Sequence, residues 1–157
     1  MIRKVCVGSF VLGGGTVAVQ GMTTKKTSDV QACVAQILAL QAAGCDIVRV
    51  AVADEADARA LRAVVERVNV PVVADVHFSA KLAVLAVENG AHKLRINPGN
   101  IGGDAQIARV AACVKAHHVP VRVGANTGSI EKEHLARYGR SAQALVESAL
   151  ANVAVLE

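Results

Sequence analysis

The sequence predicts an α/β protein, a partial (β/α)8 TIM barrel of about five βα units preceded by a short N-terminal hairpin. Strand-like and helix-like segments alternate along the chain, which is typical of a parallel sheet with right-handed crossovers. Charged residues interrupt the strand segments on one face, whereas both faces of a doubly wound sheet are usually apolar. A whole barrel needs about 250 residues, and this chain has 157. We therefore expect residues 1–157 to form part of one barrel domain.

The chain is expected to begin with a short hairpin formed by residues 5–11 and 17–22. Three consecutive glycines, Gly13, Gly14 and Gly15, would make its turn. A glycine triplet can also bind phosphate, but no helix start follows this one at the right spacing, and no Lys-Ser or Lys-Thr pair comes directly after it. The turn is therefore the better interpretation.

Polar residues mark the expected helix starts. Thr27 or Ser28 is expected to cap a helix that runs to about residue 43, and Ser79 and Asp104 are expected to cap two later helices. Residues 98–103 are expected to form a loop because they are rich in glycine. The expected strands cover residues 46–52, 70–76, 91–97 and 119–124, and the other expected helices cover residues 54–68, 131–137 and 141–153.

The composition excludes several classes of protein. Hydrophobic residues make up 53% of the chain and aromatic residues 2%, so Ala, Val, Leu and Ile must build the core. The net charge of +4 is not gathered into a stripe, and few rings could stack on bases, so we expect no nucleic-acid partner. No apolar run approaches the roughly 20 residues that span a bilayer. We expect a cytoplasmic protein whose four cysteines, Cys6, Cys33, Cys45 and Cys113, are reduced.

Polar side chains at the ends of successive strands form the candidate site. Side chains two apart on a strand share a face, and α/β proteins bind ligands where strands end and helices begin. Three arginines and one carboxylate occur in this set, an imbalance that favours an anionic ligand over internal ion pairs alone. Residues 126–129 could add backbone N–H groups to such a site. The candidate residues are Arg49, Asp75, His77, Arg95, Asn97, Arg122 and Asn126.

Several of these residues have a structural alternative. Asp75 could orient a neighbouring arginine, bind a substrate hydroxyl, or form only a salt bridge. His77 could donate a hydrogen bond to a ligand or serve as a packing or capping residue. Lys93 lies deeper on the same face, where a pair with Asp75 is favoured over ligand contact. Glu131 could be only the solvated start of a helix.

Five motifs, taken in order, resemble those of one enzyme family. They are VQGMT at residues 19–23, DIVRV at 46–50, ADVHF at 74–78, LRINPGNIG at 94–102 and GANTGS at 124–129. The chain resembles the N-terminal part of 4-hydroxy-3-methylbut-2-enyl diphosphate synthase, an iron–sulfur enzyme of the non-mevalonate isoprenoid pathway. The resemblance covers essentially the whole chain, and residues 94–102 are its most specific element.

The resemblance implies a (β/α)8 barrel followed by a smaller domain that holds a [4Fe-4S] cluster. The barrel of this family binds 2-C-methyl-D-erythritol 2,4-cyclodiphosphate, and the cluster delivers two electrons from ferredoxin or flavodoxin to open the ring and expel water. A homodimer, in which the cluster domain of one chain covers the barrel of the other, is also implied. By position, Arg49, Arg95 and Arg122 match diphosphate-binding arginines of the family, and Asp75, Asn97 and Asn126 match polar residues of the same pocket, with His77 beside them.

The chain also departs from the family pattern. Three cysteines and a glutamate of the C-terminal domain hold the cluster in this family, and the four cysteines of this chain do not form that motif. A lysine from a later barrel strand is missing, and Gly21 stands where relatives often have Ser. We therefore expect residues 1–157 to be inactive alone. The alternatives are an inactive truncated fragment that exchanges strands with another copy, and a phosphate- or pterin-binding barrel related to dihydropteroate synthase.

Overall fold

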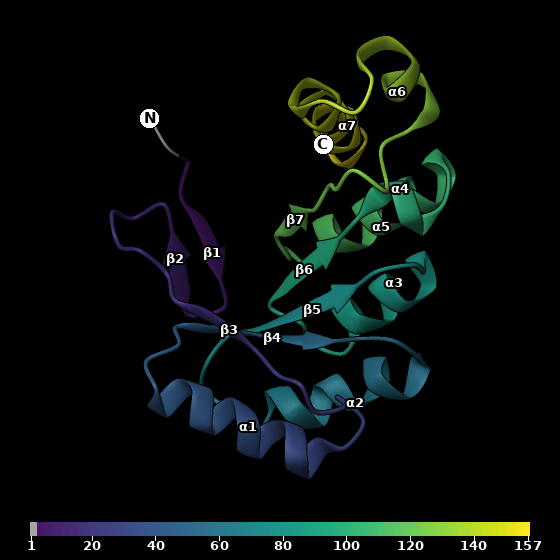
Figure 1. The fold of residues 1–157 in the computed structure, drawn as a ribbon. Helices are drawn as coiled ribbons and strands as arrows, with labels where there is room; N and C mark the ends of the chain where they lie inside the picture. Colours follow the sequence, from purple (N-terminus) through teal and green to yellow (C-terminus); the bar gives the residue numbers. More distant parts are fainter. Residues whose placement is uncertain (1–2) are drawn as a thin grey trace.

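A five-stranded parallel sheet forms the centre of the structure, a computed structural model that describes residues 3–157 (Figure 1). The strand order follows the sequence from β3 to β7, as in a barrel, and a separate antiparallel pair, β1 and β2, precedes it. The strands are β1 Val5–Val7, β2 Phe10–Leu12, β3 Gln20–Met22, β4 Ile47–Ala51, β5 Val72–Val76, β6 Lys93–Ile96 and β7 Val121–Val123. The helices are α1 Val30–Ala42, α2 Glu55–Val65, α3 Ala80–Glu88, α4 Pro98–Ile101, α5 Asp104–Ala116, α6 Lys132–Tyr138 and α7 Ala142–Leu156.

Helices cover one face of the parallel sheet and form the main core with it. Figure 1 shows α1, α2, α3 and α5 along this outer face, with the hairpin on the other side of the sheet. Every second strand residue points toward these helices, so the outer face is apolar although the strands carry charged residues. The fully buried strand residues of this core are Val48, Val50, Val72, Ala74, Val76, Leu94 and Ile96.

The inner face of the sheet is apolar at one end and charged at the other. Val7 of the hairpin packs against Ile47 and Val73, near the amino-terminal ends of β4 and β5. The residues two further along these strands are Arg49 and Asp75. The hairpin therefore covers the lower part of the inner face and leaves the carboxyl ends of the strands polar, which confirms the predicted barrel-like arrangement.

The predicted hairpin was wrong in its turn and its second strand. The turn lies at Gly8 and Ser9, where Val7 pairs with Phe10 and Gly8 takes a φ of +54°. Glycine adopts this left-handed conformation without steric cost, which is why the chain reverses there. Residues 20–22 form β3, which pairs with β4 in the parallel sheet.

Two of the predicted helix caps were also wrong. Asp29 caps α1 by accepting a hydrogen bond from the Ala32 N–H at 3.1 Å. The Thr27 hydroxyl donates to the Ala51 carbonyl at 2.5 Å, so Thr27 ties the segment before α1 to the end of β4 instead of capping the helix. Gly103 is the cap residue of α5, and Asp104 lies in the first turn. The predicted cap at Ser79 is confirmed, since its side chain accepts the Leu82 N–H, and Ser141 caps α7 in the same way although no cap was predicted there.

The region after β6 contains a helical turn that the sequence did not predict. The predicted loop at residues 98–103 includes α4, and Asn97 precedes it in an extended conformation. Near the C-terminus, α7 packs against α5 and β7. Within residues 3–157, no helix is long and apolar enough to cross a membrane.

Candidate functional site

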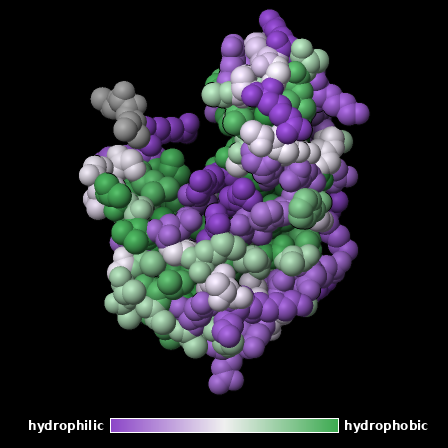
Figure 2. All heavy atoms as spheres, viewed as in Figure 1, coloured by the Kyte–Doolittle hydropathy of each residue, from purple (hydrophilic) through white to green (hydrophobic). Residues whose placement is uncertain are grey.

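The register of the parallel strands places the charged residues in two rows on the inner face. Asp75 pairs in register with Arg95, and Arg95 pairs with Arg122, so these three residues form one row across β5, β6 and β7. Arg49 and Lys93 both pair with Val73 and form the row below. Figure 2 shows hydrophilic residues gathered in the hollow between the hairpin and the end of the molecule formed by α6 and α7.

Asp75 is the centre of the upper row. Its carboxylate is 2% exposed and lies 3.0 Å from Arg95 Nη1 and 3.3 Å from Arg49 Nε. His77 Nε2 lies 3.2 Å from both Asp75 Oδ1 and Arg95 Nη1. Asp75 therefore forms salt bridges, as one of its predicted roles required, and its single carboxylate orients two arginines.

Arg49 has a second partner that the sequence did not predict. Its Nε and Nη2 donate to the Sδ atom of Met22, at 3.2 and 3.0 Å. A thioether is a weak acceptor, and Arg49 Nε also lies 3.3 Å from Asp75 Oδ2. Met22 and Asp75 together hold the Arg49 guanidinium across the ends of β3, β4 and β5.

Within the part of the chain that the structure describes, Arg122 and Lys93 have no carboxylate partner. Among residues 3–157, Arg122 forms no ion pair, and its side chain is exposed. The predicted pair of Lys93 with Asp75 is wrong, since the partners of Asp75 are Arg49, Arg95 and His77. Burial lowers the pKa of Lys93, and the charge of Arg122 lowers this pKa further. The site therefore carries an excess of positive charge, and a bound anion would reduce the repulsion between these cations.

The two candidate asparagines stabilise the loop that follows β7. Asn97 is 3% exposed, and its Nδ2 donates to Ser129 Oγ at 2.8 Å. Asn126 Oδ1 accepts the Gly128 N–H at 2.9 Å, a local turn within the loop. The structure thus brings Arg49, Asp75, His77 and Arg95 into direct contact, whereas Asn97 and Asn126 meet through Ser129.

Glu131 is not the solvated helix start that the sequence suggested as an alternative. It is the cap residue of α6, and its Oε1 accepts a hydrogen bond from Asn152 Nδ2 of α7 at 2.8 Å. Burial raises its pKa, but hydrogen bonds from Ser148 and Asn152 outweigh this effect, and the net shift is downward. Glu131 therefore anchors the end of the loop that carries Ser129.

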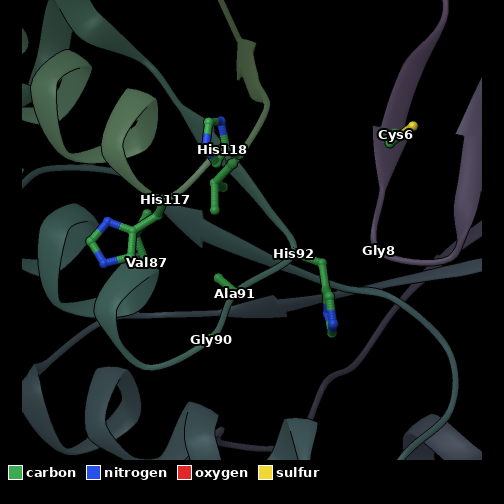
Figure 3. Close-up of a pocket in the computed structure, with 9 residues that line it drawn as sticks. Cys6, Gly8, Val87, Gly90, Ala91, His92, His117 and His118 are labelled. Atoms are coloured by element: carbon green, nitrogen blue, oxygen red, sulfur yellow. The ribbon is translucent and has the colours of Figure 1, made fainter.

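A second hollow lies at the amino-terminal ends of the strands, away from the candidate site. It encloses about 390 Å³ and is lined in part by Cys6, His92, His117 and His118. The three histidine rings do not point toward one another (Figure 3). His92 Nδ1 accepts the Val72 N–H at 3.1 Å, and burial lowers its pKa. His92 therefore has a structural role, since its ring holds the backbone of β5.

The cysteines of this chain do not fit an iron–sulfur cluster. They lie on β1, α1, the segment before β4, and α5. Within residues 3–157, no three His, Cys, Asp or Glu side chains gather as metal ligands. Burial also raises the pKa of the Cys33 and Cys113 thiols, which disfavours the thiolate form that binds iron.

Comparison with known proteins decides the family. The family model of the GcpE TIM-barrel domain matches residues 2–157. The chain belongs to the GcpE TIM-barrel family. This membership confirms the predicted fold class and the resemblance of the motifs.

Relatives of known name are similar over the same range. The chain is 50% identical to a protein of Exiguobacterium sibiricum over 157 residues, which cover 99% of this chain and 42% of that protein. It is 49% identical to a protein of Desulfotalea psychrophila, of which it covers 44%. Both relatives are named 4-hydroxy-3-methylbut-2-en-1-yl diphosphate synthase (flavodoxin). This member of the GcpE family thus spans less than half the length of these relatives.

Solved structures of low identity support the fold alone. The chain resembles dihydropteroate synthase of Yersinia pestis with a TM-score of 0.64 and 13% identity, over 96% of this chain and 58% of that one. The enzyme of Stenotrophomonas maltophilia gives a TM-score of 0.63 and 20% identity, over 96% of this chain and 61% of that one. The GcpE-family chain therefore shares its fold with these enzymes.

Proposed function

We propose that this GcpE-family chain is the N-terminal part of a 4-hydroxy-3-methylbut-2-enyl diphosphate synthase. The complete enzyme would open the ring of 2-C-methyl-D-erythritol 2,4-cyclodiphosphate reductively and expel water, in the cytoplasm. Two synthase-named relatives at 49–50% identity support this assignment. The observation that carries it is the row of Arg95 and Arg122 beside Asp75, with Arg49 directly below.

The charge of the site matches the proposed substrate. Three guanidinium groups and one carboxylate leave two positive charges, before Lys93 is counted, and a cyclic diphosphate carries about two negative charges. Each charge-assisted hydrogen bond to a phosphate oxygen contributes roughly 1.5–3 kcal/mol. Arg122 has no internal partner among the described residues, so its donors are available to the ligand. Asp75 keeps the guanidinium groups of Arg49 and Arg95 in place before the ligand arrives.

The electron transfer belongs to parts of the enzyme other than this segment. In the complete synthase, a [4Fe-4S] cluster would supply the two electrons, with flavodoxin, or alternatively ferredoxin, as the donor. The name of the relatives supports flavodoxin. Because the residues of this chain do not fit a cluster, we assign them substrate binding only. We also propose that the complete enzyme is a homodimer, and that residues 1–157 alone bind the anion without turnover.

Turnover by the complete protein that carries this segment tests the proposal. The purified protein is incubated without oxygen with the cyclic diphosphate and reduced flavodoxin, and the product is followed by phosphorus NMR. We expect the linear diphosphate to form, and Arg122→Ala to lower kcat/KM at least about tenfold. Arg67→Ala removes an exposed arginine outside the site and should have no effect. Absence of product with the unaltered protein would overturn the proposed function.

A further inference from the structure

We propose that residues 124–129, the segment that follows β7, position the two β6 side chains of the site, Arg95 and Asn97. Gly124 would do so by leaving space for the Arg95 guanidinium, and Ser129 by hydrogen bonding to Asn97. Neither residue needs to touch the ligand for this role. The inference deepens the proposed function and rests on it where the ligand is concerned.

Gly124 lies where a side chain would displace Arg95. A Cβ atom at this position would stand 2.7 Å from Arg95 Nη2, 2.9 Å from Nε and 3.1 Å from Cζ. Non-bonded contacts below 3.0 Å are too short for a Cβ atom, so the guanidinium occupies space that only glycine leaves free. The Gly124 N–H is fixed by a hydrogen bond to the Ile96 carbonyl at 2.8 Å, so the backbone cannot easily withdraw.

The position of the Arg95 guanidinium and its ion pair are linked. Arg95 Nη1 lies 3.0 Å from Asp75 Oδ1, while Nη2 and Nε of the same planar group lie against Gly124. A methyl group at Gly124 would push the plane away from β7 and so alter the pair with Asp75. Gly124 is therefore a positioning residue that acts through Arg95.

Ser129 fixes the second β6 side chain. Its hydroxyl donates to the Asn126 carbonyl at 3.2 Å and accepts from Asn97 Nδ2 at 2.8 Å and from the Asn126 N–H at 3.3 Å. One donor and two acceptor sites are the whole capacity of a hydroxyl. Both Asn97 and Ser129 are buried, so loss of the hydroxyl would leave the Asn97 amide without this acceptor.

The loops after β6 and β7 also meet backbone to backbone. A Cβ atom at Gly99 would stand 2.4 Å from the Ser129 carbonyl oxygen. This approach is possible only because Gly99 has no side chain. The segment 124–129 and the end of β6 therefore hold each other in place at both Gly124 and Ser129.

A double-mutant cycle tests the role of Gly124 in the complete protein. Calorimetric titration measures the Kd of the cyclic diphosphate and, as a second probe, of inorganic pyrophosphate. We expect Gly124→Ala to raise Kd at least about tenfold with Arg95 present and by less than about twofold when Arg95 is already Ala. Gly14→Ala is the matched control, since a Cβ there meets only ordinary contacts. Equal effects of Gly124→Ala in both backgrounds would overturn the inference.

Two further measurements keep the test decisive. Ser129→Ala should weaken binding of the cyclic diphosphate, whereas Ser129→Thr, which keeps the hydroxyl, should bind it as the unaltered protein does. An equal loss of affinity in both variants would contradict the role of the hydroxyl. If the unaltered protein binds neither probe, the proposed function fails. The same cycle read as Tm then still decides the inference, because Gly124→Ala should lower Tm only when Arg95 is present.

Discussion

At the scale of single residues, the site is organised by one buried carboxylate. Asp75 is 2% exposed, and burial of a charge is strongly destabilising unless partners compensate it. Arg49, Arg95 and His77 supply that compensation. The two arginines are thereby fixed in place at the carboxyl ends of the strands, where a ligand of an α/β protein binds.

Sequence reasoning could place these residues together but could not assign their contacts. The period of two along a strand was enough to put Arg95 and Asn97 on one face. It could not show that Asn97 turns to Ser129, or that Met22 contacts Arg49, because side-chain torsions decide both contacts. Lys93 was assigned to the wrong partner for the same reason.

The lowered pKa of Lys93 predicts a pH-dependent stability. The charged lysine is disfavoured in the folded state, first by burial and then by Arg122. At a pH below the folded-state pKa of Lys93, the lysine is charged in both states and the full penalty lowers the stability of the fold. As the pH rises from this value toward the pKa of an unfolded lysine, the folded protein holds fewer protons than the unfolded chain, so the penalty decreases. Lys93→Met should therefore stabilise the protein at pH 7, and the gain should shrink at pH 10.

Urea unfolding at both pH values measures this difference. Lys25→Met, a change of an exposed lysine, controls for the loss of one positive charge. A gain for Lys93→Met that stays the same between the two pH values would show that the Lys93 charge is not penalised by its surroundings.

At the scale of elements, the periodic parts of the chain were predictable and the turns were not. Each long helix and each parallel strand from β4 to β7 was found close to its predicted range, because their apolar patterns extend over many residues. The hairpin turn was misplaced since a glycine triplet is a stronger turn signal than the single Gly8. α1 begins later than predicted because Thr27 bonds to β4, a contact far away in the sequence.

Gly21 shows a packing constraint between β3 and α1. A Cβ atom there would stand 2.9 Å from Cys45 Sγ and 3.0 Å from Leu40 Cδ2. Gly21→Ser should therefore destabilise the protein by about 1–3 kcal/mol through overpacking. Cys45→Ala removes the nearest atom, so the serine should be tolerated better in that background. Denaturant unfolding of the four proteins measures the coupling, and an equal penalty in both backgrounds would contradict the packing account.

At the scale of the whole molecule, the described structure is an open sheet with two edges. β3 and β7 each pair with one neighbour only, and exposed apolar residues such as Val17 and Val19 lie next to β3. Unpaired strand edges are prone to pair with other chains. The charged inner face lies between these two edges, so the described residues form one wall of the site and leave the site open.

A polypeptide of residues 1–157 should therefore associate with itself. We expect oligomers or aggregates in sedimentation velocity at micromolar concentration, through pairing at β3 and β7. A single monomeric species that melts cooperatively would contradict this expectation. The complete protein serves as the control, because the rest of a barrel would cover both edges.

The affinity of the complete protein for the cyclic diphosphate tests the central claim most directly. Calorimetric titration should show binding that Arg95→Ala weakens at least about tenfold more than Lys93→Ala, because Arg95 lies in the row of Asp75 and Arg122 while Lys93 lies below it. Equal effects of the two variants, or no binding by the unaltered protein, would contradict the assignment of this arginine row to the diphosphate.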